Sequence, residues 1–186
     1  DLITTAMWAS EPIPFDPMEI AIHETYANQC SSDERKNYSM VHEYPLGGKP
    51  PMMTHLFENK NGDLIIAAKG APEAFLEIAN FSPNQKQILL TTIKKLGNEG
   101  YRLLGVGTAL FDGKNYPKTQ QEFLFDFKGI VAFYDPPKEN IKEVLQKFDD
   151  AGIQVKLVTG DNPTTALSIA KQVAFKGYDM GMTGDD

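Results

Sequence analysis

Apolar residues recur at helical spacing in the first half of the chain and predict three helices. The first begins at Asp16, which can cap it and is followed by a proline suited to the first turn, while Glu19 stands where a capping-box carboxylate reaches back. Pro72 starts a short helix, and the Ser-Pro pair at 82–83 starts a longer one. Two glycines within residues 97–100 are expected to end that longer helix.

Four further apolar runs have the length of strands. Residues 52–57 and 64–68 flank a polar segment whose Asn-Gly pair favours a tight turn with positive φ. These two runs therefore predict an antiparallel hairpin that ends near Lys69. Residues 101–110 and 122–134 predict two more strands, separated by a polar loop.

The pattern changes at residues 135–137 (Asp-Pro-Pro), where two prolines cannot donate to a strand ladder and a regular element must end. We expect a domain hinge there. Apolar residues at helical spacing then predict a helix over 141–148, which Gly152 ends, and residues 153–158 predict a strand. The turn at 159–163 (Thr-Gly-Asp-Asn-Pro) opens another helix. This succession is half of a doubly wound α/β unit.

Composition narrows the class of protein. The chain has 186 residues, 41% of them hydrophobic, which suits one large domain or two small ones at roughly 100–200 residues each. Its 18 Lys and Arg against 25 Asp and Glu give a formal charge of −7, which argues against general affinity for nucleic acid or anionic lipid. No apolar run approaches the ~20 residues of a bilayer-spanning helix, and no secretory signal is visible. Cys30 is the single cysteine, which excludes an internal disulfide and a Cys-x-x-Cys site, so a reducing, cytosolic setting fits best.

The turn after the expected strand at 153–158 carries the clearest chemistry. The carboxyl end of such a strand, where it feeds a helix, is where α/β folds hold anions such as a phosphoryl group. Thr159 offers a hydroxyl, Gly160 lets the backbone approach closely, and Asp161 could orient a nucleotide or support a cation. The other interpretation is structural: Asp161 or Asn162 caps the helix and Thr159 ends the strand.

A second candidate site is Lys69 with Gly70, at the expected end of the hairpin. The ammonium could project into a pocket floored by exposed backbone and meet an adenine edge or a phosphate. Tyr44 with Lys49 supplies an aromatic face and a nearby cation, and a stacked base contributes roughly 1–3 kcal/mol. The alternatives are an exposed lysine at a hairpin end and an ordinary half-buried tyrosine.

Two more residues have both a binding and a structural interpretation. Glu19 could accept a hydrogen bond from an adenine amino group, and the capping-box role explains it equally well. Arg102 could reach phosphates or a ribose, or pair with a surface carboxylate. The residues alone leave both choices open.

Four segments together resemble one family. They are residues 15–19 (Phe-Asp-Pro-Met-Glu), 69–73 (Lys-Gly-Ala-Pro-Glu), 135–138 (Asp-Pro-Pro-Lys) and 158–161 (Val-Thr-Gly-Asp). In this order and at these intervals they resemble the cytosolic motifs of cation-transporting P-type ATPases, over nearly the whole chain. The Lys-Gly-Ala-Pro-Glu segment brings the resemblance nearest to calcium-pump-like bacterial members.

The resemblance implies an α/β (α+β) protein of two domains. Residues 1–134 would form the nucleotide-binding domain, a twisted antiparallel sheet flanked by helices. Residues 135–186 would form part of the phosphorylation domain, a Rossmannoid α/β unit with the fold of the haloacid dehalogenase superfamily.

The resemblance also implies a role toward ATP for each candidate residue. The chain departs from the family at two of the matched positions: it has a tyrosine where a phenylalanine is usual, and Lys138 where an arginine is usual, and lysine lacks the bidentate geometry of arginine. The implied roles are adenine stacking for Tyr44; lining of the adenine pocket for Lys69 with Gly70; contacts to the base, the phosphates and the ribose or phosphate region for Glu19, Lys49 and Arg102; the loop that holds the transferring phosphoryl group and nucleotide for Thr159, Gly160 and Asp161; and the hinge-side edge of that loop for Asp135.

The chain contains no Asp-Lys-Thr-Gly segment, from which the family takes its nucleophilic aspartate, and no Gly-Asp-Gly-x-Asn-Asp segment, which helps to hold magnesium. We therefore expect an excised cytosolic fragment that binds ATP or ADP without turnover. The resemblance implies a parent pump in the cell membrane that uses ATP and Mg²⁺ and passes through an aspartyl phosphate to move a cation, with calcium as the ion suggested by similarity. Two rival interpretations are a soluble phosphatase of the haloacid dehalogenase superfamily and a non-catalytic nucleotide-binding module.

Overall fold

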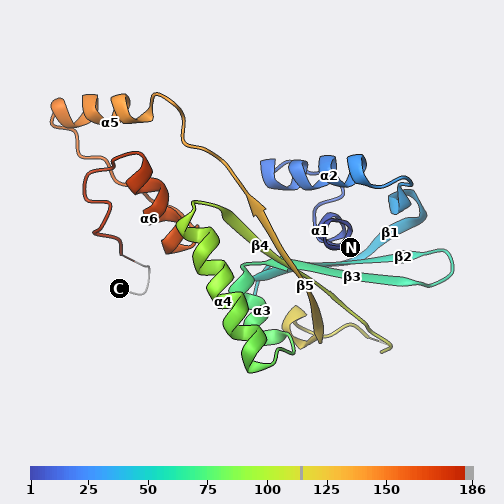
Figure 1. Cartoon of the computed structure of the whole chain (residues 1–186). Coiled ribbons are helices and arrows are strands. Elements are labelled where there is room, and N and C mark those ends of the chain that lie inside the picture. The colour runs from blue at the N-terminus through green and yellow to red at the C-terminus, as the bar shows by residue number, and fades with distance from the viewer. Residues whose placement is uncertain (114, 183–186) are drawn as a thin grey trace. The chain divides into compact units, whose positions relative to one another are not determined.

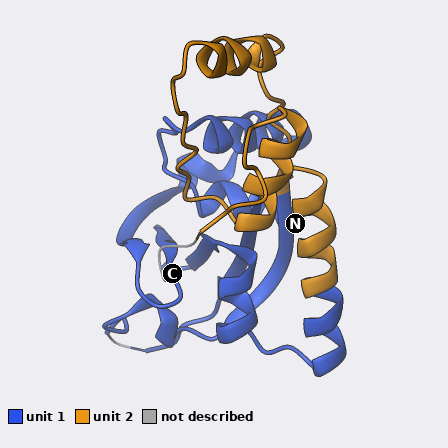
Figure 2. Ribbon diagram, turned by 90° about the vertical axis from the view of Figure 1, so that its left-hand side faces the viewer, with its two compact units in different colours: residues 1–89, 103–131 blue, residues 90–102, 132–186 orange. Residues whose placement is uncertain are grey.

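The computed structural model describes residues 1–113 and 115–182, and these form an α+β structure with two compact units. Unit 1 comprises residues 1–89 and 103–131, and unit 2 comprises residues 90–102 and 132–186, so each unit is built from two pieces of chain (Figure 2). No helix among the described residues is long and apolar enough to cross a membrane. The expected domain boundary after residue 134 stays a prediction.

A five-stranded sheet in the order β1-β2-β3-β4-β5 forms the framework (Figure 1). Neighbouring strands run antiparallel in the pairs β1 with β2, β2 with β3, and β3 with β4. The predicted hairpin is confirmed, with Gly62 at φ +85° in its turn. The strands are β1 (Tyr38–Gly47), β2 (Met52–Asn59), β3 (Leu64–Gly70), β4 (Arg102–Ala109) and β5 (Phe125–Phe133).

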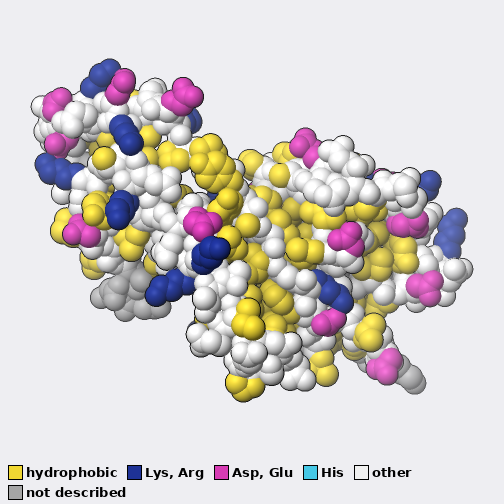
Figure 3. All heavy atoms as spheres, in the orientation of Figure 1, with side chains coloured by type: hydrophobic (Ala, Val, Ile, Leu, Met, Phe, Trp, Pro, Cys, Tyr) yellow, Lys and Arg dark blue, Asp and Glu magenta, His cyan; other side chains and the backbone are white. Residues whose placement is uncertain are grey.

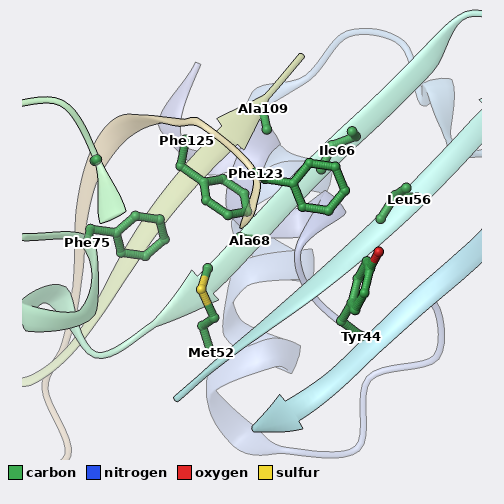
Figure 4. Packing of buried hydrophobic residues seen from close by; sticks show 10 residues of the cluster. Tyr44, Met52, Leu56, Ile66, Ala68, Phe75, Ala109, Phe123 and Phe125 are labelled. Carbon is green, nitrogen blue, oxygen red and sulfur yellow. The ribbon is translucent and has the colours of Figure 1, made fainter. Parts of the chain in front are cut away.

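One face of the sheet carries an aromatic and aliphatic core within unit 1 (Figure 4). Phe75, from helix α3 (Pro72–Ile78), is fully buried there. It packs so closely on β4 that a Cβ added at Gly107 would lie 2.6 Å from its ring, which explains the glycine at that position. The remaining members of this core are Tyr44, Met52, Leu56, Ile66, Ala68, Ala79, Ala109, Phe123 and Phe125.

The opposite face of the sheet is covered by α1 (Leu2–Trp8) and α2 (Pro17–Gln29), as Figure 1 shows. Trp8 packs on Phe57 of β2, with ring centroids 4.8 Å apart. Sequence reasoning predicted α2 but neither α1 nor β1. The Asp16 cap of α2 is confirmed, because its carboxylate accepts from Met18 N–H at 2.6 Å. The expected capping box is wrong, because Glu19 turns away from the start of the helix and bonds Lys69 instead.

Within unit 2, α5 (Ile141–Asp150) and α6 (Pro163–Gln172) confirm the two predicted helices. The predicted strand at 153–158 is wrong: these residues form no strand in the structure. A strand needs a partner for its backbone N–H and C=O groups, and none pairs with this run among the described residues. Apolar side chains of the run stay exposed, with Val158 at 91%. Helix α4 (Pro83–Asn98) runs from one unit into the other and ends before Gly100, at φ +85°.

Phe75→Ala tests the core of unit 1. Deleting this ring should lower the free energy of unfolding of unit 1 by about 3–5 kcal/mol, because the lost burial is compounded by a cavity. Urea unfolding, monitored through the fluorescence of the single tryptophan Trp8, measures this free energy. The control Leu124→Ala removes an 87% exposed side chain and should change the value by less than about 0.5 kcal/mol. Equal midpoints for the two variants would contradict the assigned core.

Candidate functional site

The most distinctive polar group of unit 1 is a buried ion pair between Glu19 and Lys69. Glu19 lies in the first turn of α2, and Lys69 is the penultimate residue of β3. The Lys69 ammonium donates to Glu19 Oε1, and the two side chains are only 7% (Glu19) and 12% (Lys69) exposed. Glu11 N–H donates to the same oxygen at 3.2 Å.

The second carboxylate oxygen of Glu19 distinguishes this pair from a purely structural one. Glu19 Oε2 is buried and has no hydrogen-bond partner among the described residues. A buried acceptor without a donor costs about 1–3 kcal/mol, so proteins seldom leave one unless a water or ligand completes it. The pair therefore presents one cation and one vacant anionic acceptor side by side.

The register of β3 places the Lys69 side chain on the face of the sheet that α2 covers. Lys69 pairs with Met53 on one side and Val106 on the other, and directly paired residues share a face of the sheet. Gly70 follows it at the end of the strand, where an added Cβ would lie 3.1 Å from Pro51 O and from Met52 Cβ. The glycine therefore lets β2 and β3 close tightly beside the ion pair.

The structure does not bring Tyr44 to this pair. Tyr44 pairs with Thr54, which pairs with Ala68, so its ring belongs to the face opposite Lys69. Figure 4 shows the ring directed into the core with Phe123. Its hydroxyl donates to Pro117 O at 2.6 Å, and burial raises the pKa of Tyr44 above its usual value of 10.0. The expectation that a purine lodges between Tyr44 and Lys69 is therefore wrong, because the sheet separates them.

The remaining predicted residue of unit 1, Lys49, lies in the connection between β1 and β2 with an exposed side chain. Lys49 and Tyr44 both lie near the end of β1, but Lys49 is exposed to solvent and Tyr44 is in the core.

Unit 2 holds the other predicted residues. Arg102 Nε donates to Asp161 Oδ1 at 3.1 Å, and Arg102 Nη2 lies 3.1 Å from the same oxygen in an ion pair. Asp161 N–H in turn donates to Thr159 Oγ1 at 3.0 Å, which closes a tight turn around the exposed Gly160. Helix α6 is capped by Asn162, whose Oδ1 accepts from Thr164 N–H at 2.9 Å. The Asp161 carboxylate is thus committed to Arg102 rather than to the helix.

The Arg102–Asp161 pair is much more exposed than the pair in unit 1. The two side chains are 39% (Arg102) and 28% (Asp161) exposed, so solvent weakens their attraction to about 1 kcal/mol or less. Asp135, the last predicted residue, is exposed in the segment that follows β5. An anion could therefore compete for Arg102 at little cost.

Two histidines that sequence reasoning missed lie on the α1–α2 side of the sheet. His23 of α2 places Nδ1 3.0 Å from Arg35 Nη1, and His55 of β2 places Nδ1 3.1 Å from Ser10 O. Burial lowers the pKa of both below 6.5, with Arg35 adding to the effect at His23. Their sequence signal is a histidine among apolar neighbours that are buried, such as Ile22 and Tyr26 for His23 and Phe57 for His55.

The family model described as P-type ATPase, cytoplasmic domain N, matches residues 15–140, more than half of the chain. A sodium/potassium exporting P-type ATPase of Schizosaccharomyces pombe is 31% identical over 172 residues, covering 86% of this chain and 17% of the relative. A calcium-transporting ATPase of Bacillus subtilis is 26% identical over 171 residues (85% and 19%).

A third relative, the human sodium/potassium-transporting ATPase subunit alpha-4, is 30% identical over 174 residues, covering 83% of this chain and 17% of the relative. The chain thus spans about a fifth or less of the length of these relatives. The match to the family model extends over both ends of the Glu19–Lys69 pair and over Arg102. The chain therefore belongs to the family of the P-type ATPase cytoplasmic domain N.

Proposed function

We propose that this chain is the nucleotide-binding part of a cation-transporting P-type ATPase and that it binds ATP or ADP beside Glu19 and Lys69. The observation that carries the proposal is the vacant, buried Oε2 of Glu19 next to the Lys69 ammonium. Adenine offers a 6-amino donor next to a ring-nitrogen acceptor. The amino group would donate to Glu19 Oε2, and Lys69 would donate to a ring nitrogen while keeping its bond to Glu19.

Tyr44 has no part in this proposed pocket, because its ring packs on the other face of the sheet. We retain Lys49 and Gly70 as residues that border the proposed pocket, because each lies at or beside the end of a strand. Separately, within unit 2, we propose that Arg102, Asp135 and the loop of Thr159, Gly160 and Asp161 bind phosphate oxygens. The Arg102–Asp161 pair would open there to let the guanidinium meet phosphate oxygens.

The parent protein is proposed to couple ATP hydrolysis, through an aspartyl phosphate, to cation transport across the cell membrane. The chain lacks the Asp-Lys-Thr-Gly segment, so it should release no phosphate from ATP; a malachite-green assay of the purified 186-residue chain checks this. The parent would also use Mg²⁺. The Thr159–Asp161 loop offers a single carboxylate, which is paired with Arg102 in the structure, so this loop alone would not hold the ion.

Calcium is the transported ion that the motif resemblance suggests. The matched relatives are named for sodium and potassium as well as for calcium. A segment common to pumps for different ions is suited to the shared task, nucleotide binding, and ion choice would then lie outside it. Transport assays on the parent pump with each ion would decide whether calcium is its cargo.

The first test of the pocket is Lys69→Met. Contacts to the adenine, together with partly solvated cations, should give a net binding free energy of about 5–6 kcal/mol. This corresponds to a dissociation constant on the order of 0.1 mM. Removing the ammonium should weaken ATP binding at least tenfold, measured from amide shifts during titration. Because Lys69→Met leaves Glu19 unpaired, the double variant Glu19→Gln/Lys69→Met serves as the folded check. Lys128→Met, at an exposed ion pair of β5, is the matched control. An unchanged affinity of Lys69→Met for ATP would contradict the assignment of this pocket.

The second test exchanges the hydrogen-bonding character of the base. Inosine triphosphate carries a 6-oxo acceptor in place of the amino donor of ATP, so Glu19 should disfavour it at least tenfold. Glu19→Gln can donate as well as accept and should narrow that preference severalfold or more. Glu24→Gln, at an exposed position of α2, should keep the wild-type preference. Equal affinities of wild type for the two nucleotides would show that Glu19 does not contact the 6-position.

A further inference from the structure

Three side chains of the types that can ligate a metal ion converge on the face of the sheet that α1 and α2 cover. Glu11 lies in the segment of chain that connects those two helices. Glu43 lies in β1, and His55 lies directly opposite it in β2. One carboxylate oxygen of each glutamate and one ring nitrogen of His55 all lie within 4.8 Å of one another. Nothing in the proposed nucleotide pocket uses these atoms.

His55 separates this cluster from an ordinary group of surface acids. Acidic side chains are scattered over the visible face of the molecule (Figure 3), so two neighbouring carboxylates would indicate little. His55, in contrast, is fully buried, and its Nε2 has no hydrogen-bond partner among the described residues. A buried ring nitrogen of this kind calls for a partner.

The tautomer of His55 is fixed by its other nitrogen. Nδ1 lies 3.1 Å from the backbone carbonyl oxygen of Ser10, which can only accept, so Nδ1 carries the proton and donates it. In the neutral ring Nε2 then keeps its lone pair. Metal-binding histidines are held in this way, with one nitrogen donating to a carbonyl and the other free for the ion.

We propose that Glu11, Glu43 and His55 bind one divalent transition-metal ion of the zinc class. Two carboxylates and an imidazole suit zinc or cobalt better than magnesium or calcium, which prefer oxygen ligands alone. Ligands about 2.1 Å from a tetrahedral ion lie about 3.4 Å from one another. The exposed Glu43 and half-exposed Glu11 can close that gap by side-chain rotation, while His55 stays fixed. Water would fill the open position.

The charges around the cluster favour a dication. Glu11 and Glu43 contribute two negative charges, and the neighbouring Lys69 is already paired with Glu19. Burial lowers the pKa of the His55 ring below its usual value, with Lys69 acting in the same direction and the two glutamates opposing it. A bound dication would neutralise the facing carboxylates and complete the vacant Nε2. The site does not depend on nucleotide binding.

Calorimetric titration of the chelator-treated 186-residue chain with ZnCl₂, without nucleotide, tests the proposal. We expect saturation at one ion per chain with a micromolar dissociation constant. Glu11→Gln and Glu43→Gln should each weaken binding at least tenfold, and both change exposed or half-exposed side chains that the fold tolerates. Glu58→Gln, an exposed acid of β2, and His42→Gln, a histidine of β1 on the other face, are matched controls that should bind like wild type.

Nitrogen-detected spectra identify the ligand atom. The chain has three histidines, and zinc should move the Nε2 resonance of His55 while leaving those of His23 and His42 in place. With Co²⁺, visible absorption should report a low-coordinate site. Binding without saturation, unchanged affinity in both glutamine variants, or a shift of His42 in place of His55 would each overturn the site. Trp8 fluorescence verifies that every variant is folded.

Discussion

The two-residue period of strands β2 and β3 is the constraint on which the organisation of unit 1 depends. Every second side chain of these strands enters the aromatic core, and the intervening ones face α1 and α2. The buried polar side chains of these strands to which we assign ligands, Lys69 and His55, both lie on the helix-covered side. The apolar core therefore acts as a rigid backing that holds those side chains toward one surface.

The buried pair of Glu19 and Lys69 contributes more to placement than to stability. Desolvation of two charges offsets most of their attraction, so a buried pair is weak evidence for stabilisation, whereas loss of one partner costs about 3–5 kcal/mol. The second oxygen of Glu19 adds a further cost, because it is buried without a donor. Unit 1 thus holds a polar arrangement that its own contacts leave incomplete, and this is the physical signature expected of a binding site.

Local signals predicted many elements correctly, and they failed where long-range pairing decides. The Asp16 cap and the Asn-Gly turn act within a few residues, so α2 and the β2–β3 hairpin were readable from the sequence. The apolar run at 153–158 has the composition of a strand but no pairing partner among the described residues. The short α1 and the mixed polar and apolar β1 carry no strong periodicity, and both escaped prediction.

Tyr44 shows why site geometry is harder to predict than elements. Strand β1 has register shifts between Met40 and His42 and between Tyr44 and Gly47. A shift of one residue moves each following side chain to the other face, and no local signal in the sequence announces it. The residues carrying the motifs were therefore identifiable one by one, but which of them meet was not.

The two ion pairs among the predicted site residues, Glu19–Lys69 and Arg102–Asp161, also differ in their degree of burial. The Glu19–Lys69 pair is almost enclosed and is fixed by backbone register, so its geometry suits a rigid object such as a base edge. The Arg102–Asp161 pair is partly solvated and weak, so it can exchange its carboxylate for another anion at a cost of about 1 kcal/mol. A rigid contact suits a planar base, and an adaptable contact suits phosphates whose charge and position change as they are transferred. In the proposed function, the degree of burial of each pair, and not its chemical type, therefore determines which kind of group it can bind.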